Sequence, residues 1–203
     1  MKTIIYIDGF NFYYLALKWT HFKWLDFKSL FQKLLPNNDI IKIKYFTANV
    51  SGKYDQRKPR RQQNYLNALE SFTPEIEIIK GYFQTNEVEM PLARNPKKRV
   101  SVLKTEEKCT DVNLAVHLVN DGWKKYFECA VILSNDGDLS EAMRIVHDEL
   151  NLCIGLITPG KVGTSQSLLQ YSTFRKRIRK NALKSSQLPD KIPGTNIVKP
   201  IEW

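Results

Sequence analysis

Four aspartates occupy positions in this sequence from which their carboxylates can converge. Asp8 follows one apolar run, Asp136 and Asp138 follow another, and Asp111 falls in the first turn of an expected helix. Carboxylates that lie close together repel one another unless a cation compensates their charge. Oxygen ligands favour hard ions such as Mg²⁺ or Mn²⁺ over zinc. The pattern therefore predicts a divalent metal site.

Three of these acids also have a purely structural explanation. Asp8 fits an Asp-Gly turn, Asp111 suits the positive end of a helix, and Asp138 with Glu141 has the spacing of a capping box. Asp136 lacks such an explanation, because a second acid two positions before a cap is not needed to start a helix. The four together are a stronger indication than any one of them.

Alternating strands and helices are expected to position these acids. Apolar and β-branched runs predict strands, and apolar residues at helical spacing predict helices, with Asn11 and Thr110 available as N-caps. This alternation favours an α/β fold with a doubly wound, mostly parallel sheet, whose strands all end at one edge. The expected strands are Ile4 to Ile7, Ile40 to Ala48, Glu75 to Phe83, Phe127 to Leu133 and Leu152 to Ile157; the expected helices are Asn11 to Trp19, Asp26 to Leu35, Tyr65 to Phe72, Thr110 to Trp123, Leu139 to Leu150 and Ser165 to Tyr171.

The length and composition are those of one domain followed by a tail. The chain has 203 residues and 42% hydrophobic content, enough for one sizeable core. We expect a domain over residues 1–170 and a basic extension over residues 171–203. No apolar run approaches the roughly 20 residues of a membrane span, and no signal-peptide pattern precedes the first strand, so a cytoplasmic protein without membrane contact is expected. Three scattered cysteines favour reduced thiols.

The chain carries a formal charge of +10, which favours a polyanionic partner. Residues 171–203 contribute +6 of it, with eight basic against two acidic residues. A basic stretch from Ser51 to Arg61 and a long segment from Thr85 to Glu107 without clear periodicity carry further positive charge; we expect the long segment to be a mobile basic arm over the site. Solvated charge alone explains each group equally well. The candidate nucleic-acid contacts are Arg57, Lys58, Arg60, Arg61, Arg94, Lys97, Lys98, Arg99, Arg175, Lys176, Arg177, Arg179 and Lys180.

Three motifs resemble those of a known family. Ile7-Asp8-Gly9-x-Asn11, Thr110-Asp111-Val112 and Ser134-Asn135-Asp136-Gly137-Asp138 are similar, in order and spacing, to the acidic motifs of NYN domains in the PIN-like ribonuclease superfamily. The resemblance covers about residues 3 to 170. It implies a three-layer α/β/α fold, a Mg²⁺ or Mn²⁺ cofactor and hydrolysis of phosphodiester bonds, mostly in RNA.

The resemblance also implies roles for individual residues. Asp8, Asp111, Asp136 and Asp138 would be catalytic metal ligands, with Asn11 and Ser134 as polar helpers that position water or a phosphate oxygen. One departure concerns the middle motif: many relatives have a glycine before the aspartate or one residue further back, and this chain has Cys109-Thr110-Asp111. Glu106 and Glu107 come shortly before it and are weaker candidates for a further ligand.

Other functions are compatible with parts of the sequence. The main alternative is a non-catalytic module of the same fold that binds RNA or a protein. A phosphotransferase with Asp8 as nucleophile is less favoured, because Phe10 stands two residues on where such enzymes have a second acid. The scattered histidines indicate no Ser/His/Asp triad, and no G-x-G-x-x-G follows the first strand. The sequence leaves open the choice between single-stranded and structured RNA, RNA and DNA, one ion and two, and monomer, homodimer and larger complex.

Overall fold

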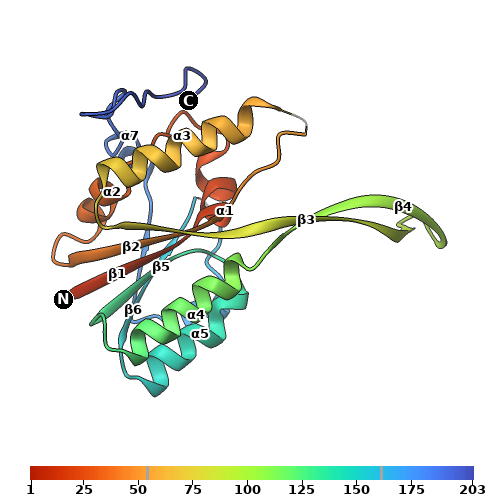
Figure 1. Cartoon of the computed structure of the whole chain (residues 1–203). Helices are drawn as coiled ribbons and strands as arrows, with labels where there is room; N and C mark the ends of the chain where they lie inside the picture. Colours follow the sequence, from red (N-terminus) through yellow and green to blue (C-terminus); the bar gives the residue numbers. More distant parts are fainter. Residues whose placement is uncertain (54, 161) are drawn as a thin grey trace.

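A computed structural model describes residues 1–53, 55–160 and 162–203 of the chain. It confirms the α/β prediction, because a central, mostly parallel sheet of seven strands is flanked by helices (Figure 1). The spatial order of the strands is β4-β3-β2-β1-β5-β6-β7, and β1 and β5 lie at its centre. The strands are β1 (Lys2–Asp8), β2 (Asp39–Ala48), β3 (Ile76–Leu92), β4 (Asn95–Lys108), β5 (Cys129–Leu133), β6 (Cys153–Thr158) and β7 (Phe174–Arg177).

Helices cover both faces of this sheet, as strands that are apolar on both sides require. In β1, the side chains of Ile5 and Ile7 belong to one core cluster and those of Ile4 and Tyr6 to another. The first cluster includes residues of α2 and α3, and the second includes residues of α4 and α5 (Figure 1). The helical segments are α1 (Gly9–Phe12), η1 (Tyr13–Leu17), α2 (Phe27–Leu34), α3 (Arg57–Phe72), α4 (Thr110–Trp123), η2 (Gly137–Leu139), α5 (Ser140–Arg144), η3 (Ile145–Glu149), α6 (Gln166–Leu169) and α7 (Lys180–Lys184).

The first helix begins differently from the prediction. Its N-cap is Asp8, whose Oδ1 accepts a hydrogen bond from the Asn11 N–H, so the expectation that Asn11 would be the cap is wrong. The helix then continues as a π-helical turn, η1, a geometry often found near functional sites.

Helix α4 also begins differently, because Cys109 rather than Thr110 precedes its first turn. Cys109 has φ 73°, in the left-handed region that glycine adopts at least cost. The resemblance to NYN domains implies a glycine in many relatives at this position or the next. Cys109, where the sequence departs from the family pattern, is therefore held in a strained backbone conformation.

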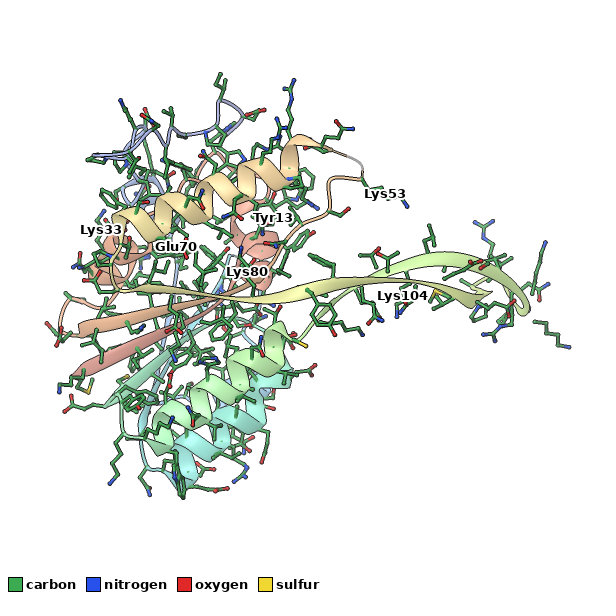
Figure 2. The ribbon with its side chains drawn as sticks, viewed as in Figure 1. Tyr13, Lys33, Lys53, Glu70, Lys80 and Lys104 are labelled. Atoms are coloured by element: carbon green, nitrogen blue, oxygen red, sulfur yellow. The ribbon has the colours of Figure 1, made fainter. Side chains whose placement is uncertain are left out.

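The segment from Thr85 to Glu107 is a regular β-ribbon that projects from the body, so the expectation of an irregular arm lying over the site is wrong. β3 and β4 pair antiparallel, with Val88 opposite Val102 and Met90 opposite Val100. Figure 1 shows the ribbon projecting away from the body, and Figure 2 shows its side chains, such as Lys104, standing out from it. Its inner end lies beside the candidate site and its basic tip does not.

The segment after residue 170 packs on the body. β7 adds a parallel strand beside β6, and the chain then returns to the α3 side, where the Trp203 ring contacts Trp24 and Tyr65. In the basic stretch from Ser51 to Arg61, residue 54 lies outside the described residues, and the part from Arg57 onward is the start of α3 rather than a loop. In the part of the chain that the structure describes, no helix has both the length and the apolarity needed to cross a membrane.

Candidate functional site: an acidic cluster at the carboxyl edge of the sheet

Asp8 is fixed by hydrogen bonds at both of its carboxylate oxygens. Oδ1 accepts from the Asn11 N–H at 2.9 Å and Oδ2 accepts from the Ser134 hydroxyl at 2.9 Å. The residue is only 3% exposed. Burial is the largest cause that raises the pKa of Asp8 to about 6; the two hydrogen bonds oppose this, and the charges of Asp111 and Asp136 add to it.

The loop after β5 is tied to the loop after β1. Besides binding Asp8, the Ser134 hydroxyl accepts a hydrogen bond from the Asp136 N–H at 3.0 Å. The Asn11 Oδ1 accepts from the Asn135 N–H, also at 3.0 Å. Asn11 and Ser134, which were predicted to position water or a phosphate oxygen, therefore form hydrogen bonds within the protein and set the positions of the acids.

Three of the four predicted acids come together. One carboxylate oxygen each from Asp8, Asp111 and Asp136 lies within 4.8 Å of the other two, with Asp8 buried, Asp136 half-buried and Asp111 exposed. Parallel β1 and β5 deliver Asp8 and Asp136 to the same edge of the sheet, and the first turn of α4 brings Asp111. Burial, followed by the charges of Asp136 and Asp138, raises the pKa of Asp111.

Asp138 lies outside this group of three oxygens and is exposed. Its charge still raises the pKa of Asp111, so it lies at the rim of the cluster. The capping-box explanation for Asp138 is wrong, because the N-cap of η2 is Asp136, which accepts a hydrogen bond from the Asp138 N–H at 3.0 Å. The expectation that Asp136 has no structural explanation is therefore also wrong, since Asp136 caps this helical turn as well as joining the cluster.

Glu107, near the end of β4, is a further acid beside the cluster. Burial raises its pKa to about 7, and the charges of Asp8 and Asp111 add to the shift. The nearby Thr110 hydroxyl acts in the opposite direction and lowers the pKa of Glu107. The Glu107 Oε1 and the Thr110 Oγ1 are both buried, and neither forms a hydrogen bond of good geometry within the described structure. Glu106 differs, since Lys104 and Lys108 hold its pKa at about 2.

The candidate nucleic-acid contacts form three separate groups, and all but the half-buried Arg61 are exposed. The first group begins α3, where Arg61 pairs with Asp55 and lies 3.7 Å from a Glu202 carboxylate oxygen. The second group lies at the tip of the ribbon, and the third lies on β7 and in the chain just after it. The groups are Arg57, Lys58, Arg60 and Arg61; Arg94, Lys97, Lys98 and Arg99; and Arg175, Lys176, Arg177, Arg179 and Lys180.

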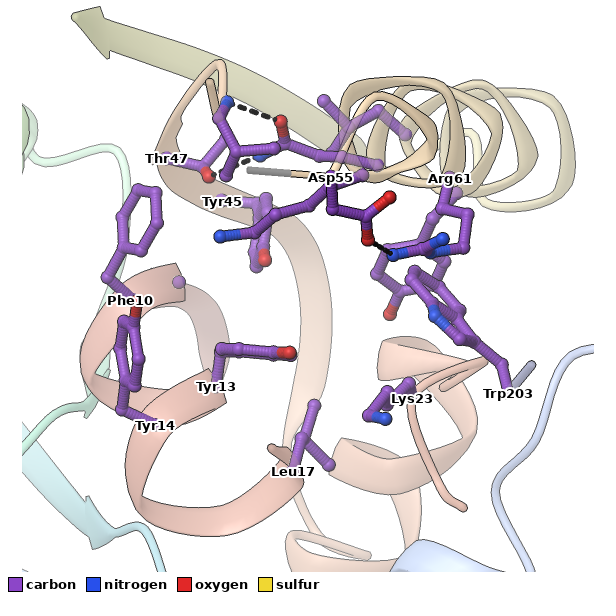
Figure 3. A pocket seen from close by; sticks show the side chains of 16 residues that line it. Phe10, Tyr13, Tyr14, Leu17, Lys23, Tyr45, Thr47, Asp55, Arg61 and Trp203 are labelled. Atoms are coloured by element: carbon purple, nitrogen blue, oxygen red, sulfur yellow. Dashed lines mark hydrogen bonds and ion pairs between the residues drawn. The ribbon is translucent and has the colours of Figure 1, made fainter. Parts of the chain in front are cut away.

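An aromatic cavity of about 290 Å³ adjoins the acidic cluster (Figure 3). Its lining includes the rings of Tyr13, Tyr45 and Trp203 and the cationic groups of Lys23 and Arg61. Tyr45 lines the cavity and its hydroxyl end lies against Gly9, the residue after Asp8. Burial, together with the charge of Asp8, raises the pKa of Tyr45. One acid also lines the cavity, because Asp55 lies there beside Arg61, its ion-pair partner (Figure 3).

Comparisons with known proteins agree with the fold. The NYN domain family matches residues 2–176. A curated relative, 6-hydroxy-3-succinoylpyridine 3-monooxygenase HspA of Pseudomonas putida (strain DSM 28022 / S16), is 33% identical over 236 residues, covering 100% of this chain and 75% of the relative. A solved structure, of the protein of unknown function VPA0982 from Vibrio parahaemolyticus RIMD 2210633, superposes with a TM-score of 0.58 at 16% identity, covering 92% of this chain and 96% of that one. At this identity the superposition shows the fold alone.

Proposed function

The chain belongs to the NYN domain family, and on that premise we propose that it is a metal-dependent endoribonuclease of the PIN-like superfamily. Family membership suggests a nuclease. The observation that carries the finer proposal is the approach of the Asp8, Asp111 and Asp136 carboxylate oxygens to within 4.8 Å of one another. Such a group of like charges is stable in a folded protein when a cation neutralises it.

The donor set fits a hard divalent ion. All three acids offer oxygen, which suits Mg²⁺ or Mn²⁺. The buried Glu107 Oε1 has no hydrogen-bond donor in the described structure, so it is a further oxygen available to a cation. We therefore assign Glu107 to the site beside these three acids and place Asp138 at its rim.

The residues around the acids have distinct tasks in this mechanism. Ser134 and Asn11 hold Asp8 and the loop after β5 in place, so that the carboxylates stay together without substrate. A bound Mg²⁺ or Mn²⁺ would supply Lewis acidity, lowering the pKa of the attacking water and stabilising negative charge on the phosphate. No side-chain nucleophile is required. The exposed basic groups would hold the RNA backbone, with an affinity that falls steeply as salt rises.

Cleavage of a labelled single-stranded RNA with Mn²⁺ tests this proposal. We expect turnover by the parent that stops in EDTA, and a loss of roughly 100-fold or more in Asp8→Asn and Asp136→Asn. Asp148→Asn, an exposed acid on η3, serves as the matched control and should cleave like the parent. Equal cleavage by the parent and both site variants would contradict the proposal, and RNA affinity without turnover would favour the non-catalytic module.

A second candidate function comes from the curated relative, whose name describes the oxygenation of a substituted pyridine. The cavity beside Asp8 favours it, because aromatic rings line this cavity together with three basic residues, Lys23, Lys58 and Arg61, against the single acid Asp55. A small aromatic acid has matching chemistry. A monooxygenase transfers one oxygen atom of O₂ to a carbon of its substrate as a hydroxyl group and reduces the other to water with two protons and two electrons from a donor. Incubation of the protein with 6-hydroxy-3-succinoylpyridine, O₂ and reduced nicotinamide distinguishes the two candidates: loss of the pyridine's absorbance supports the oxygenase, and an unchanged spectrum leaves the nuclease.

A further inference from the structure

The segment that follows Asp8 presents aromatic rings to solvent. Trp19 is 86% exposed and Tyr14 is 50% exposed, so burial in the core does not account for either ring. The Phe10 ring stacks on that of Tyr14, with centroids 6.4 Å apart. The Lys18 Nζ lies 4.8 Å from the Tyr14 centroid and 4.9 Å from the Trp19 centroid. Aromatic rings and a cation therefore follow one another away from the acidic cluster.

This segment crosses the carboxyl edge of the sheet toward β6 and β7. β5, β6 and β7 are parallel, so the chain leaves β6 and β7 at the same edge as the acids. Gly160, just beyond β6, packs against the backbone of Leu15: a Cβ at position 160 would lie 2.2 Å from the Leu15 carbonyl oxygen. Neighbouring strands are about 4.8 Å apart, which places the end of β7 within a few nucleotides' reach of the acids.

A groove of about 720 Å³ lies between the aromatic segment and the chain that leaves β7. Tyr14 and Trp19 line one side, and Arg177, Arg179 and Lys180 line the other. The three basic residues are exposed, and none of them forms an ion pair with another described residue. The groove has no acidic lining residue within the described chain. Its surface therefore combines flat rings with uncompensated positive charge.

We propose that this groove binds a single-stranded stretch of the RNA next to the cleaved phosphate. Unpaired bases would stack on Tyr14 and Trp19, and the phosphates would lie along Arg177, Arg179 and Lys180. Every base has a face that can stack, so such a surface accepts many sequences. A duplex keeps its bases stacked on one another and has no free base face to offer. The proposal rests on the proposed function for its substrate, but the binding can be measured without turnover.

The test is the anisotropy of a fluorescein-labelled oligouridylate, titrated with the full-length protein in EDTA so that no cleavage occurs. Stacking on one aromatic residue is worth enough that Trp19→Ala should weaken binding roughly 5-fold or more. Trp19→Phe should retain most of the affinity. Removing Arg177 and Arg179 together should reduce the slope of log K against log salt by about one to two. A blunt-ended RNA duplex should bind more weakly and be insensitive to Trp19→Ala.

Trp123 provides the matched control. It is 75% exposed but lies with Phe127 and Leu152 near the opposite ends of β5 and β6, so Trp123→Ala should bind the oligouridylate like the parent. Since Trp19 is largely in solvent, the thermal midpoint of Trp19→Ala should match that of the parent. Unchanged RNA affinity in Trp19→Ala would overturn the groove proposal, even if the acids prove catalytic. Cleavage that survives Asp136→Asn would instead refute the nuclease assignment and leave the measured groove affinity standing.

Discussion

Replacing Asp8 by asparagine should make the metal-free protein more stable at neutral and alkaline pH. The pKa of Asp8 is raised from 3.8 to about 6 in the folded chain. Because the folded-state pKa lies above the unfolded value, the ionised carboxylate costs stability above about pH 6, and the cost disappears below about pH 4. A shift of about 2 units corresponds to roughly 3 kcal/mol.

Asparagine removes this charge but does not keep both hydrogen bonds. Its oxygen can still accept from the Asn11 N–H, and its amide group faces the Ser134 hydroxyl, which costs about 1 kcal/mol. The net expectation is a gain of about 2 kcal/mol in the free energy of unfolding at about pH 8 in EDTA. At about pH 4 the gain should vanish or change sign. Saturating Mn²⁺ stabilises the parent by about 3 kcal/mol at 100 times Kd and should remove the variant's advantage.

Urea denaturation followed by tryptophan fluorescence measures this in EDTA and in Mn²⁺ at both pH values. Ser134→Ala is the matched control: it removes the same hydroxyl bond but keeps the carboxylate, and it should destabilise the metal-free protein at both pH values. If Asp8→Asn loses the same stability at about pH 8 and about pH 4 in EDTA, ionisation of the buried Asp8 carboxylate carries no free-energy cost in the folded chain and the reasoning is refuted.

Three further predictions concern the surroundings of the site. Cys109→Gly should stabilise the protein by up to about 1 kcal/mol in thermal denaturation, because glycine tolerates the φ of 73° at this position; a lower midpoint would contradict the strain. Asp121→Ala should cost roughly 3–5 kcal/mol in urea denaturation, since it leaves the buried Lys44 without the carboxylate oxygen that lies 2.6 Å from its Nζ. Lys44→Met should cost a similar amount because it leaves the buried Asp121 carboxylate without its cation, and the variant with both replacements should lose clearly less than the sum of the two; additive losses would argue against an uncompensated charge. Reversing the charge at the ribbon tip with Lys97→Glu and Lys98→Glu should weaken RNA binding and flatten its salt dependence without changing the thermal midpoint; unchanged binding would exclude the tip from the RNA interface.

The meeting of the acids was predictable because it depends on features that the sequence carries locally. A fully apolar run such as Cys129–Leu133 becomes a buried central strand, and parallel strands end at one edge. Asp8 and Asp136 therefore had to lie near each other once the sheet was inferred. The arrival of Asp111 followed from its place in the first turn of a strongly periodic helix.

The structure differs from the prediction mainly where the pairing of β-strands, rather than a local sequence pattern, decides the conformation. The β3–β4 ribbon projects from the body, and most of its residues are exposed. The alternation of Val88 and Met90 with glutamates, and of Val100 and Val102 with polar residues, was a strand signal that the sequence interpretation missed. The role of Glu107 depends on the register that sets Phe83 opposite it, which no local pattern reports. The strand at Phe174–Arg177 is short and basic and forms by pairing at the edge of the sheet. Glu107 lies nearer than Glu106 to the middle motif, and this position was the signal that could have favoured Glu107 over Glu106 as a further ligand.

Anomalous diffraction from crystals soaked in Mn²⁺ tests the central claim most directly, since it locates the ion without reference to activity. The account predicts a manganese peak within coordination distance of the Asp8, Asp111 and Asp136 carboxylates, about 2 Å from their oxygens, and its loss in Asp136→Asn crystals. A peak at any other place, or none at these carboxylates at saturating Mn²⁺, would contradict the assignment of this acidic cluster as the metal centre of a nuclease.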